Sequence, residues 1–158
     1  MYISRLQLGL QTAHVVARIG VRGQTGRITS DAYCYFWKWA QHHETIIILD
    51  GGYSENLSRL EDFFGANENP YPWAAFREDP LALGSGTAEG PAGALTAVGI
   101  VLPERIYKTA ELARKDEATR LLLNTYAMNQ VVNPDIPNDL TNWEMEMINE
   151  LNKYKLAR

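Results

Sequence analysis

Hydrophobic and polar positions recur along this chain with the periods of helices and strands. The stretch "SRLQLGLQTAHVVARI", residues 4–19, has the helical period, with an apolar face and a polar stripe beside it. The stripe consists of Gln7, Gln11, His14 and Arg18. A merely solvated helix face would more often carry Lys and Glu, so the stripe is a candidate functional surface. The other interpretation, a surface helix whose His points into water, stays open.

The apolar face of this first helix contains small residues. Gly9 and Ala13 lie next to Leu6 and Leu10 on the helical period. Small side chains allow a helix backbone to approach a neighbouring element closely. We therefore expect this face to lie against a sheet.

The remaining pattern predicts the order helix, helix, strand, helix, strand, strand and then further helices. The second helix, "SDAYCYFWKWAQHH", concentrates aromatic side chains, which we interpret as packing surface. The run "ETIIILD" predicts a strand over residues 45–50 that is buried on both faces, as in a parallel sheet. The stretches "WAAFRE" and "ALTAVGIV" predict two more strands, and "SENLSRLEDFF" predicts the helix before them.

The last third of the chain is predicted to be helical. Residues 104–132 predict one long helix, and a closing helix follows a loop with two prolines. Thr141 and Glu144 have the spacing of a capping box at the start of the closing helix. Its apolar seam consists of Trp143, Met147, Leu151 and Tyr154. Because this seam must be buried, we expect the extension to pack on its own chain or on a second copy in a homodimer.

Composition narrows the class of protein. The 158 residues are 46% hydrophobic and 22% charged, which suits one globular domain with a sizeable core. A net charge of -4 argues against broad, non-specific nucleic-acid binding, although arginines gather near the N-terminus. One cysteine, Cys34, allows no intramolecular disulfide, and no run is long and apolar enough for a membrane span. We expect a cytoplasmic protein that contacts no membrane and keeps Cys34 in its core.

Three segments between about residues 4 and 103 resemble the peptidyl-tRNA hydrolase II family. The family's first helix runs approximately G-K-G-K-I-A-A-Q-C-G-H-A, and "SRLQLGLQTAHV" is similar to it without a gap. Gln11 and His14 fall on its Gln and His, and Arg5 and Gln7 fall on its two lysines. The family's K-W-E-x-G-G-Q-K-K-I-V-L-K resembles "KWAQHHETIIILD".

The third segment of the family is I-R-D-A-G-L-T-Q-I-x-x-G-T-x-T-V-L-G-I-G-P. Here "FREDPLAL" and "GALTAVGIVLP" resemble its two ends, with a longer loop between them. Arg77 with Glu78 or Asp79 matches the Arg-Asp pair, and Thr96 and Gly99 match the final strand.

The resemblance implies a fold and a domain organisation. It implies an α/β fold, a three-layer α/β/α sandwich with a small mixed sheet, over residues 1–103, and a helical extension over residues 104–158. The chain departs from the family at Gln7, which replaces a lysine, and at Ala94, which replaces a threonine. Only residues 1–3 stand where the family has its opening strand, so either the sheet lacks this strand or another segment or subunit fills its place.

The resemblance also implies a reaction, hydrolysis of the ester between a peptide and the 3′ ribose of tRNA. His14 would act as general base, and Glu78 or Asp79 would orient it. Gln11 would hold the ester carbonyl, with Thr96 as a neighbouring donor. The residues expected to bind substrate phosphates are Arg5, Gln7, Arg18 and Arg22. No cofactor and no metal is expected, since further His or Cys ligands do not accompany the sequence His-His-Glu at 42–44.

A second hypothesis keeps this fold without the reaction. His14 is then a structural residue, and the protein binds a nucleotide, an RNA-like ligand or another protein. The missing lysine at position 7 and the acidic net charge favour this hypothesis, whereas the aligned polar stripe favours hydrolysis. The two hypotheses make different structural predictions. Hydrolysis requires that His14, an acid near Asp79 and Thr96 converge within hydrogen-bonding reach, whereas binding alone does not.

Overall fold

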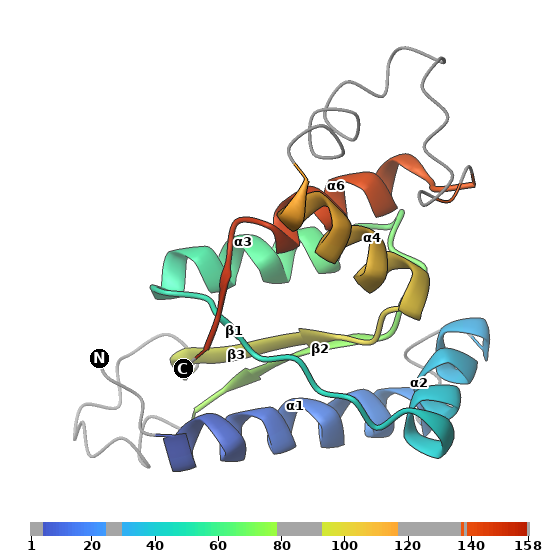
Figure 1. Ribbon diagram of the computed structural model, residues 1–158. Coiled ribbons are helices and arrows are strands. Elements are labelled where there is room, and N and C mark those ends of the chain that lie inside the picture. The colour runs from blue at the N-terminus through green and yellow to red at the C-terminus, as the bar shows by residue number, and fades with distance from the viewer. Residues whose placement is uncertain (1–4, 25–29, 79–92, 117–136, 138, 158) are drawn as a thin grey trace. The chain divides into compact units, whose positions relative to one another are not determined.

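The computed structural model describes residues 5–24, 30–78, 93–116, 137 and 139–157. Along these residues the elements are α1 (Arg5–Gln24), α2 (Ser30–His42), β1 (Leu49–Asp50), α3 (Ser54–Phe64), β2 (Trp73–Arg77), β3 (Leu95–Ile100), α4 (Glu104–Lys115), α6 (Asn142–Leu151) and β4 (Lys155–Leu156) (Figure 1). The protein is thus mixed α/β, and the predicted order of elements is confirmed except for the additional strand β4. None of the described helices is long and apolar enough to cross a membrane.

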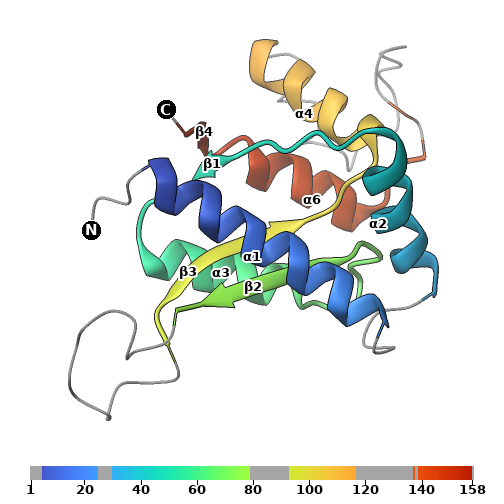
Figure 2. The same ribbon diagram turned by 90° about the horizontal axis from the view of Figure 1, so that it is seen from below.

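The chain divides into two compact units, Met1–Val101 and Leu102–Arg158. In the first unit both predicted strands form, and β2 and β3 make an antiparallel pair with Phe76 opposite Ala97. Helices α1 and α3 pack against this pair from opposite sides (Figures 1 and 2). The register shifts after Phe76, so that Thr96 has no residue directly opposite it. Such a bulge re-aims a strand side chain.

One apolar core holds the first unit together. Its buried members are Val15, Ile19, Phe36, Ala74 and Phe76. Gly99 of β3 lets α1 approach the strands, because a Cβ at this position would lie 2.6 Å from Cγ1 of Val15. Cys34, expected in this core, is instead exposed on α2.

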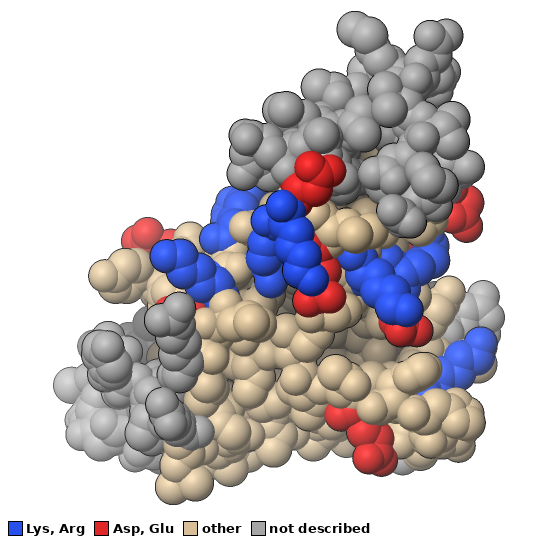
Figure 3. Space-filling model, viewed as in Figure 1, with Lys and Arg blue, Asp and Glu red and all other residues tan. Residues whose placement is uncertain are grey.

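The outward face of α1 is apolar. Leu6 is 84% exposed and Leu10 53% exposed, and Gly9 has open space around it. On the side of the molecule that Figure 3 shows, the described surface over α1 is almost entirely uncharged. Our expectation that this face lies against the sheet is therefore wrong. The opposite face, with Val15 and Ile19, supplies the branched side chains that fill the core.

The apolar run at residues 45–50 forms less strand than predicted. Only Leu49–Asp50 is a strand, and Ile46 and Ile47 are 50% and 38% exposed. The prediction of a strand buried on both faces is wrong. In the described part of this unit β2 and β3 pair only with each other, so residues 45–48 have no sheet neighbours against which two faces could be buried.

The second unit, Leu102–Arg158, is built on α4 and α6. Its buried core consists of Ile106, Ala110, Ala113, Leu140, Met145 and Ile148. Thr141 and Glu144 form the predicted capping box, in which each side chain accepts a hydrogen bond from the other's backbone N–H. The Glu144 carboxylate also pairs with Arg105 of α4. One buried acid therefore caps α6 and joins it to α4.

The long helix predicted over residues 104–132 is wrong as one continuous element. Helix α4 ends at Lys115, because the backbone of Asp116 is extended. Residues 117–132 lie outside the described part of the chain. Of the predicted apolar seam, Trp143, Met147 and Tyr154 are buried and Leu151 is partly buried.

Candidate functional site

A buried polar cluster joins α1 to the strand pair. Oε1 of Gln11 accepts a hydrogen bond from the hydroxyl of Thr96 at 2.9 Å, and its Nε2 donates to Oε1 of Glu78 at 3.2 Å. These partners are 85 and 67 positions away in the sequence. Gln11 is only 6% exposed, so protein groups replace water at both ends of its amide. The amide is held in one orientation as a result.

Local structure explains how the two partners reach Gln11. Thr96 lies at the bulge of β3, where it has no opposite residue. Glu78 directly follows β2, and its backbone N–H donates to the carbonyl of Ala94 at 2.9 Å. Gly93 has a φ of 56°, and a Cβ there would collide with the Glu78 carbonyl oxygen. Only glycine therefore allows the chain to enter β3 so close to Glu78.

His14 lies beside this cluster on the ring of Phe76. The two ring centroids are 4.2 Å apart and the rings are nearly parallel, at 4°. Phe76 is buried and His14 is exposed. The stack fixes the plane of the imidazole while water still reaches its outer side. Among the described residues no hydrogen bond joins His14 to Glu78 or Thr96, so the convergence expected for hydrolysis is not formed by these residues, and Asp79 lies outside them.

Two arginines of α1 reach across to β2. Nη1 of Arg18 donates to the carbonyl of Ala75 at 3.0 Å, and its guanidinium lies 4.8 Å from the centroid of the Phe76 ring. Nη1 of Arg22 donates to the carbonyl of Trp73 at 2.9 Å, and its guanidinium lies 4.6 Å from the indole centroid. Each guanidinium is therefore held by a hydrogen bond and a cation–π contact.

The predicted site residues are thus brought together in part. Gln11, Glu78 and Thr96 are joined by hydrogen bonds, with His14 next to them. Glu78 accepts from Gln11 and not from His14. Gln7 is exposed near the start of α1. Asp79 and the side chain of Arg5 lie outside the described residues.

Sequence reasoning missed the two aromatic side chains under the cations, Trp73 and Phe76. A usable signal was present for Phe76. Alternation along a strand places Ala74 and Phe76 on one side, and both belong to the core that α1 covers. The sequence could therefore have predicted that the Phe76 ring contacts side chains of the polar stripe of α1.

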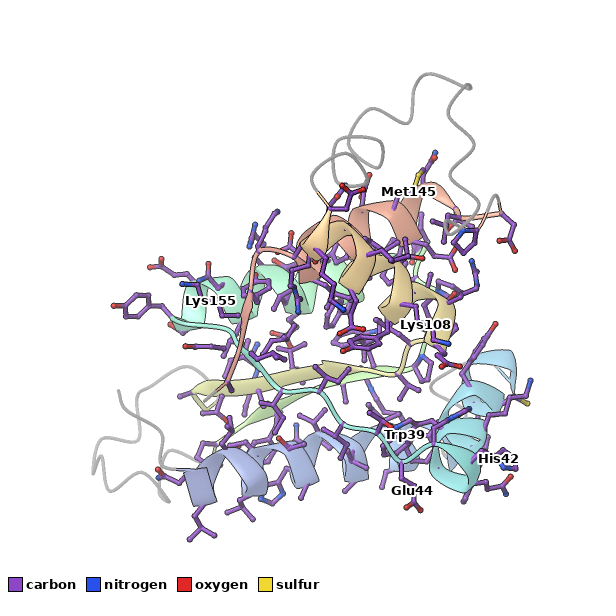
Figure 4. The ribbon with its side chains drawn as sticks, viewed as in Figure 1. Trp39, His42, Glu44, Lys108, Met145 and Lys155 are labelled. Atoms are coloured by element: carbon purple, nitrogen blue, oxygen red, sulfur yellow. The ribbon has the colours of Figure 1, made fainter. Side chains whose placement is uncertain are left out.

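At the end of helix α2 lies the sequence His42-His43-Glu44, where no metal site is expected. His42 and Glu44 extend in different directions from this helix end (Figure 4). No group of three or more His, Cys, Asp or Glu side chains in the described ranges has the geometry to hold a metal ion.

No protein-family model matches the chain, and neither the curated proteins nor the solved structures provide a match. The function must therefore be inferred from these residues and their geometry.

Proposed function

We propose that this protein is similar in activity to peptidyl-tRNA hydrolases and cleaves the ester between a peptide and the tRNA 3′ end. The observation that carries the proposal is the hydrogen-bonded group Gln11, Thr96 and Glu78. The first and the third of the segments that resemble the family meet at these residues, and His14 lies beside them. If each short motif resembled the family only by chance, there would be no reason for residues of different segments to lie together in the fold.

The chemistry assigns a different task to each group. A water molecule attacks the ester carbonyl, and His14 accepts its proton at the exposed side of the imidazole. One N–H of the Gln11 amide is held by Glu78, which leaves the second N–H to polarise the carbonyl oxygen. The products are a peptide with a free carboxylate and a tRNA with a free 3′ hydroxyl. Asp79 remains the proposed partner that orients His14.

Substrate binding is proposed for the basic side of α1. Arg18 and Arg22, with Arg5 and Gln7 near the start of the helix, are the proposed contacts to tRNA phosphates. The reaction is proposed to need no cofactor or metal.

A second candidate function is binding without catalysis. The observation that favours it is the position of His14, which stacks on Phe76 while Glu78 is engaged with Gln11. In this alternative the same surface holds a nucleotide, an RNA-like ligand or a protein, and His14 only packs.

Release of deacylated tRNA from a model peptidyl-tRNA tests the proposal. We expect His14→Ala to lower turnover by about a hundredfold or more, since a positioned base contributes on that order. Thermal melting should be almost unchanged, because His14 is exposed. His42→Ala is the matched control, an exposed histidine on α2. Unchanged turnover in folded His14→Ala excludes His14 from the chemistry, and no turnover by the unaltered protein leaves only the binding function.

The finer features of fold and assembly belong to the same proposal. We infer a three-layer α/β/α sandwich, supported by the helices on opposite sides of β2 and β3. We also infer a cytoplasmic protein without membrane contact and a homodimer formed through residues 104–158. Light scattering on a chain truncated after Glu104 tests the dimer, because an unchanged association state removes these residues from the interface.

A further inference from the structure

The backbone of β2 has an outer edge that does not face β3. The carbonyl of Pro72 accepts from Val101, and the N–H of Glu78 donates to Ala94, so even-numbered residues of this segment bond toward β3. In an antiparallel pair the alternate residues point the other way. The backbone groups of Trp73 and Ala75 therefore face outward, which is the side that receives the two arginines.

The two guanidiniums are spaced by the strand itself. Their carbonyl anchors, at Trp73 and Ala75, are two residues apart, which is about 7 Å along a β-strand. Each guanidinium also lies over an aromatic ring, so its position is set before any ligand arrives. A guanidinium has five N–H donors, and a bond to one carbonyl does not exhaust them. Arg18 is exposed and forms no ion pair among the described residues.

The two arginines of α1 lead to the candidate site. His14, Arg18 and Arg22 follow one another at intervals of four residues on α1, and His14 shares the Phe76 ring with Arg18. A chain of phosphates that passes Arg22 and then Arg18 would end beside His14 and Gln11. The protein as a whole carries a net charge of -4, so this pair of arginines is a local site and not part of a general basic surface.

We propose that Arg22 and Arg18 bind two successive phosphates of a single-stranded RNA 3′ end along the outer edge of β2. This proposal rests on the proposed function, whose substrate carries its ester at such an end. The strand direction follows from the geometry, with the phosphate farther from the 3′ terminus on Arg22 and the nearer one on Arg18. Arginine suits this task because its planar fork can contact carbonyl, ring and phosphate together.

The test is fluorescence anisotropy of a short single-stranded RNA, labelled at its 5′ end, over a series of salt concentrations. The variants are Arg18→Gln and Arg22→Gln, because glutamine removes the charge and keeps a polar side chain with N–H donors. We expect each variant to weaken binding by about tenfold at low salt and to reduce the slope of log K against log salt by about 0.7, the value for one phosphate on a single strand.

Arg114→Gln is the matched control, since Arg114 also donates to a backbone carbonyl, that of Leu151, but lies in the other unit. It should leave both affinity and slope unchanged. The proposal is overturned if the unaltered protein does not bind the RNA, or if Arg18→Gln and Arg22→Gln bind with the original slope. In the latter case the arginines only cover the open strand edge, and Arg18→Met with Arg22→Met should self-associate.

The RNA-binding measurement gives its result whether or not the protein hydrolyses the ester. RNA binding that depends on both arginines, without ester hydrolysis, supports this proposal and leaves the proposed function as binding alone. Ester hydrolysis that is unchanged in Arg18→Gln and Arg22→Gln supports the proposed reaction and overturns the proposal that these two arginines bind successive phosphates.

Discussion

The hydroxyl of Thr96 donates a hydrogen bond to Oε1 of Gln11 at 2.9 Å, from the bulge of β3 to the buried face of α1. We expect Thr96→Val to lower the free energy of unfolding by about 1–3 kcal/mol, because it leaves a buried amide oxygen without a donor. Valine has nearly the shape of threonine, so packing should change little. Urea denaturation measures the effect.

Two further variants separate this bond from side-chain shape. Thr12→Val removes a hydroxyl that bonds only within α1, to the carbonyl of Leu8, and should change stability far less. Gln11→Leu combined with Thr96→Val should recover part of the loss, since both polar partners are then gone. A Thr96→Val protein as stable as Thr12→Val would show that the bond contributes nothing.

The close approach of Gly99 to Val15 leads to a second prediction. A Cβ on Gly99 would lie 2.6 Å from Cγ1 of Val15, and a β-branched side chain in a helix has almost no other rotamer to adopt. We expect Gly99→Ala to destabilise the protein by about 1–3 kcal/mol through overpacking.

A double-mutant cycle with Val15→Ala identifies the clash. The double variant should be more stable than the sum of the single effects predicts, by about 1 kcal/mol. Gly9→Ala is the control of opposite sign: its position on α1 is open, so alanine should stabilise the helix by about 0.5–1 kcal/mol. Strictly additive effects at positions 15 and 99 would contradict the clash.

The parts of the fold that sequence predicts well are those fixed by neighbouring residues. The capping box of Thr141 and Glu144 needs a spacing of three residues, and it forms as predicted. The short, mainly apolar run Trp73–Arg77 likewise forms its predicted strand. The run at 45–50 fails because its burial depends on which strands pair, a non-local choice that its own apolar residues do not encode.

In the candidate site, too, the features set by local sequence are predictable and those set by distant partners are not. The spacing of Gln11 and His14 on α1 follows from the helical period, although the period alone could not say which apolar face meets the sheet. The Thr96 bond to Gln11 depends on a register shift between strands, and Arg18 depends on a carbonyl 57 residues away. Such partners are defined only when the strands have paired.

A third prediction concerns Glu144, whose side chain is almost fully buried at the start of α6. Its carboxylate accepts from the backbone N–H of Thr141 at 2.8 Å and pairs with Arg105. We expect Glu144→Ala to cost about 2–4 kcal/mol, because it removes a capping bond and takes the buried partner from the Arg105 guanidinium, which keeps only its ion pair with the exposed Asp139. Glu144→Gln keeps the capping oxygen, so it should cost less.

The surface pair of Lys108 and Glu104, one turn apart on α4, provides the comparison. Glu104→Ala should change stability by less than about 0.5 kcal/mol, as for exposed i,i+4 pairs. If Glu144→Ala is no more harmful than Glu104→Ala in urea denaturation, the buried pair does not stabilise the unit Leu102–Arg158.

The last prediction uses Glu44, the one described residue other than glycine with a positive φ, at 47°. It follows α2, where its N–H and that of His43 both donate to the carbonyl of Trp39. This conformation costs an L-residue about 1–2 kcal/mol, whereas glycine adopts it freely and loses about 0.5–1 kcal/mol through its more mobile unfolded chain. We therefore expect Glu44→Gly to raise the free energy of unfolding by about 0.5–1 kcal/mol. Glu44→Ala removes the same carboxylate but keeps the strain, so it should give no such gain, and equal stabilisation by both variants would assign the effect to charge instead of backbone conformation.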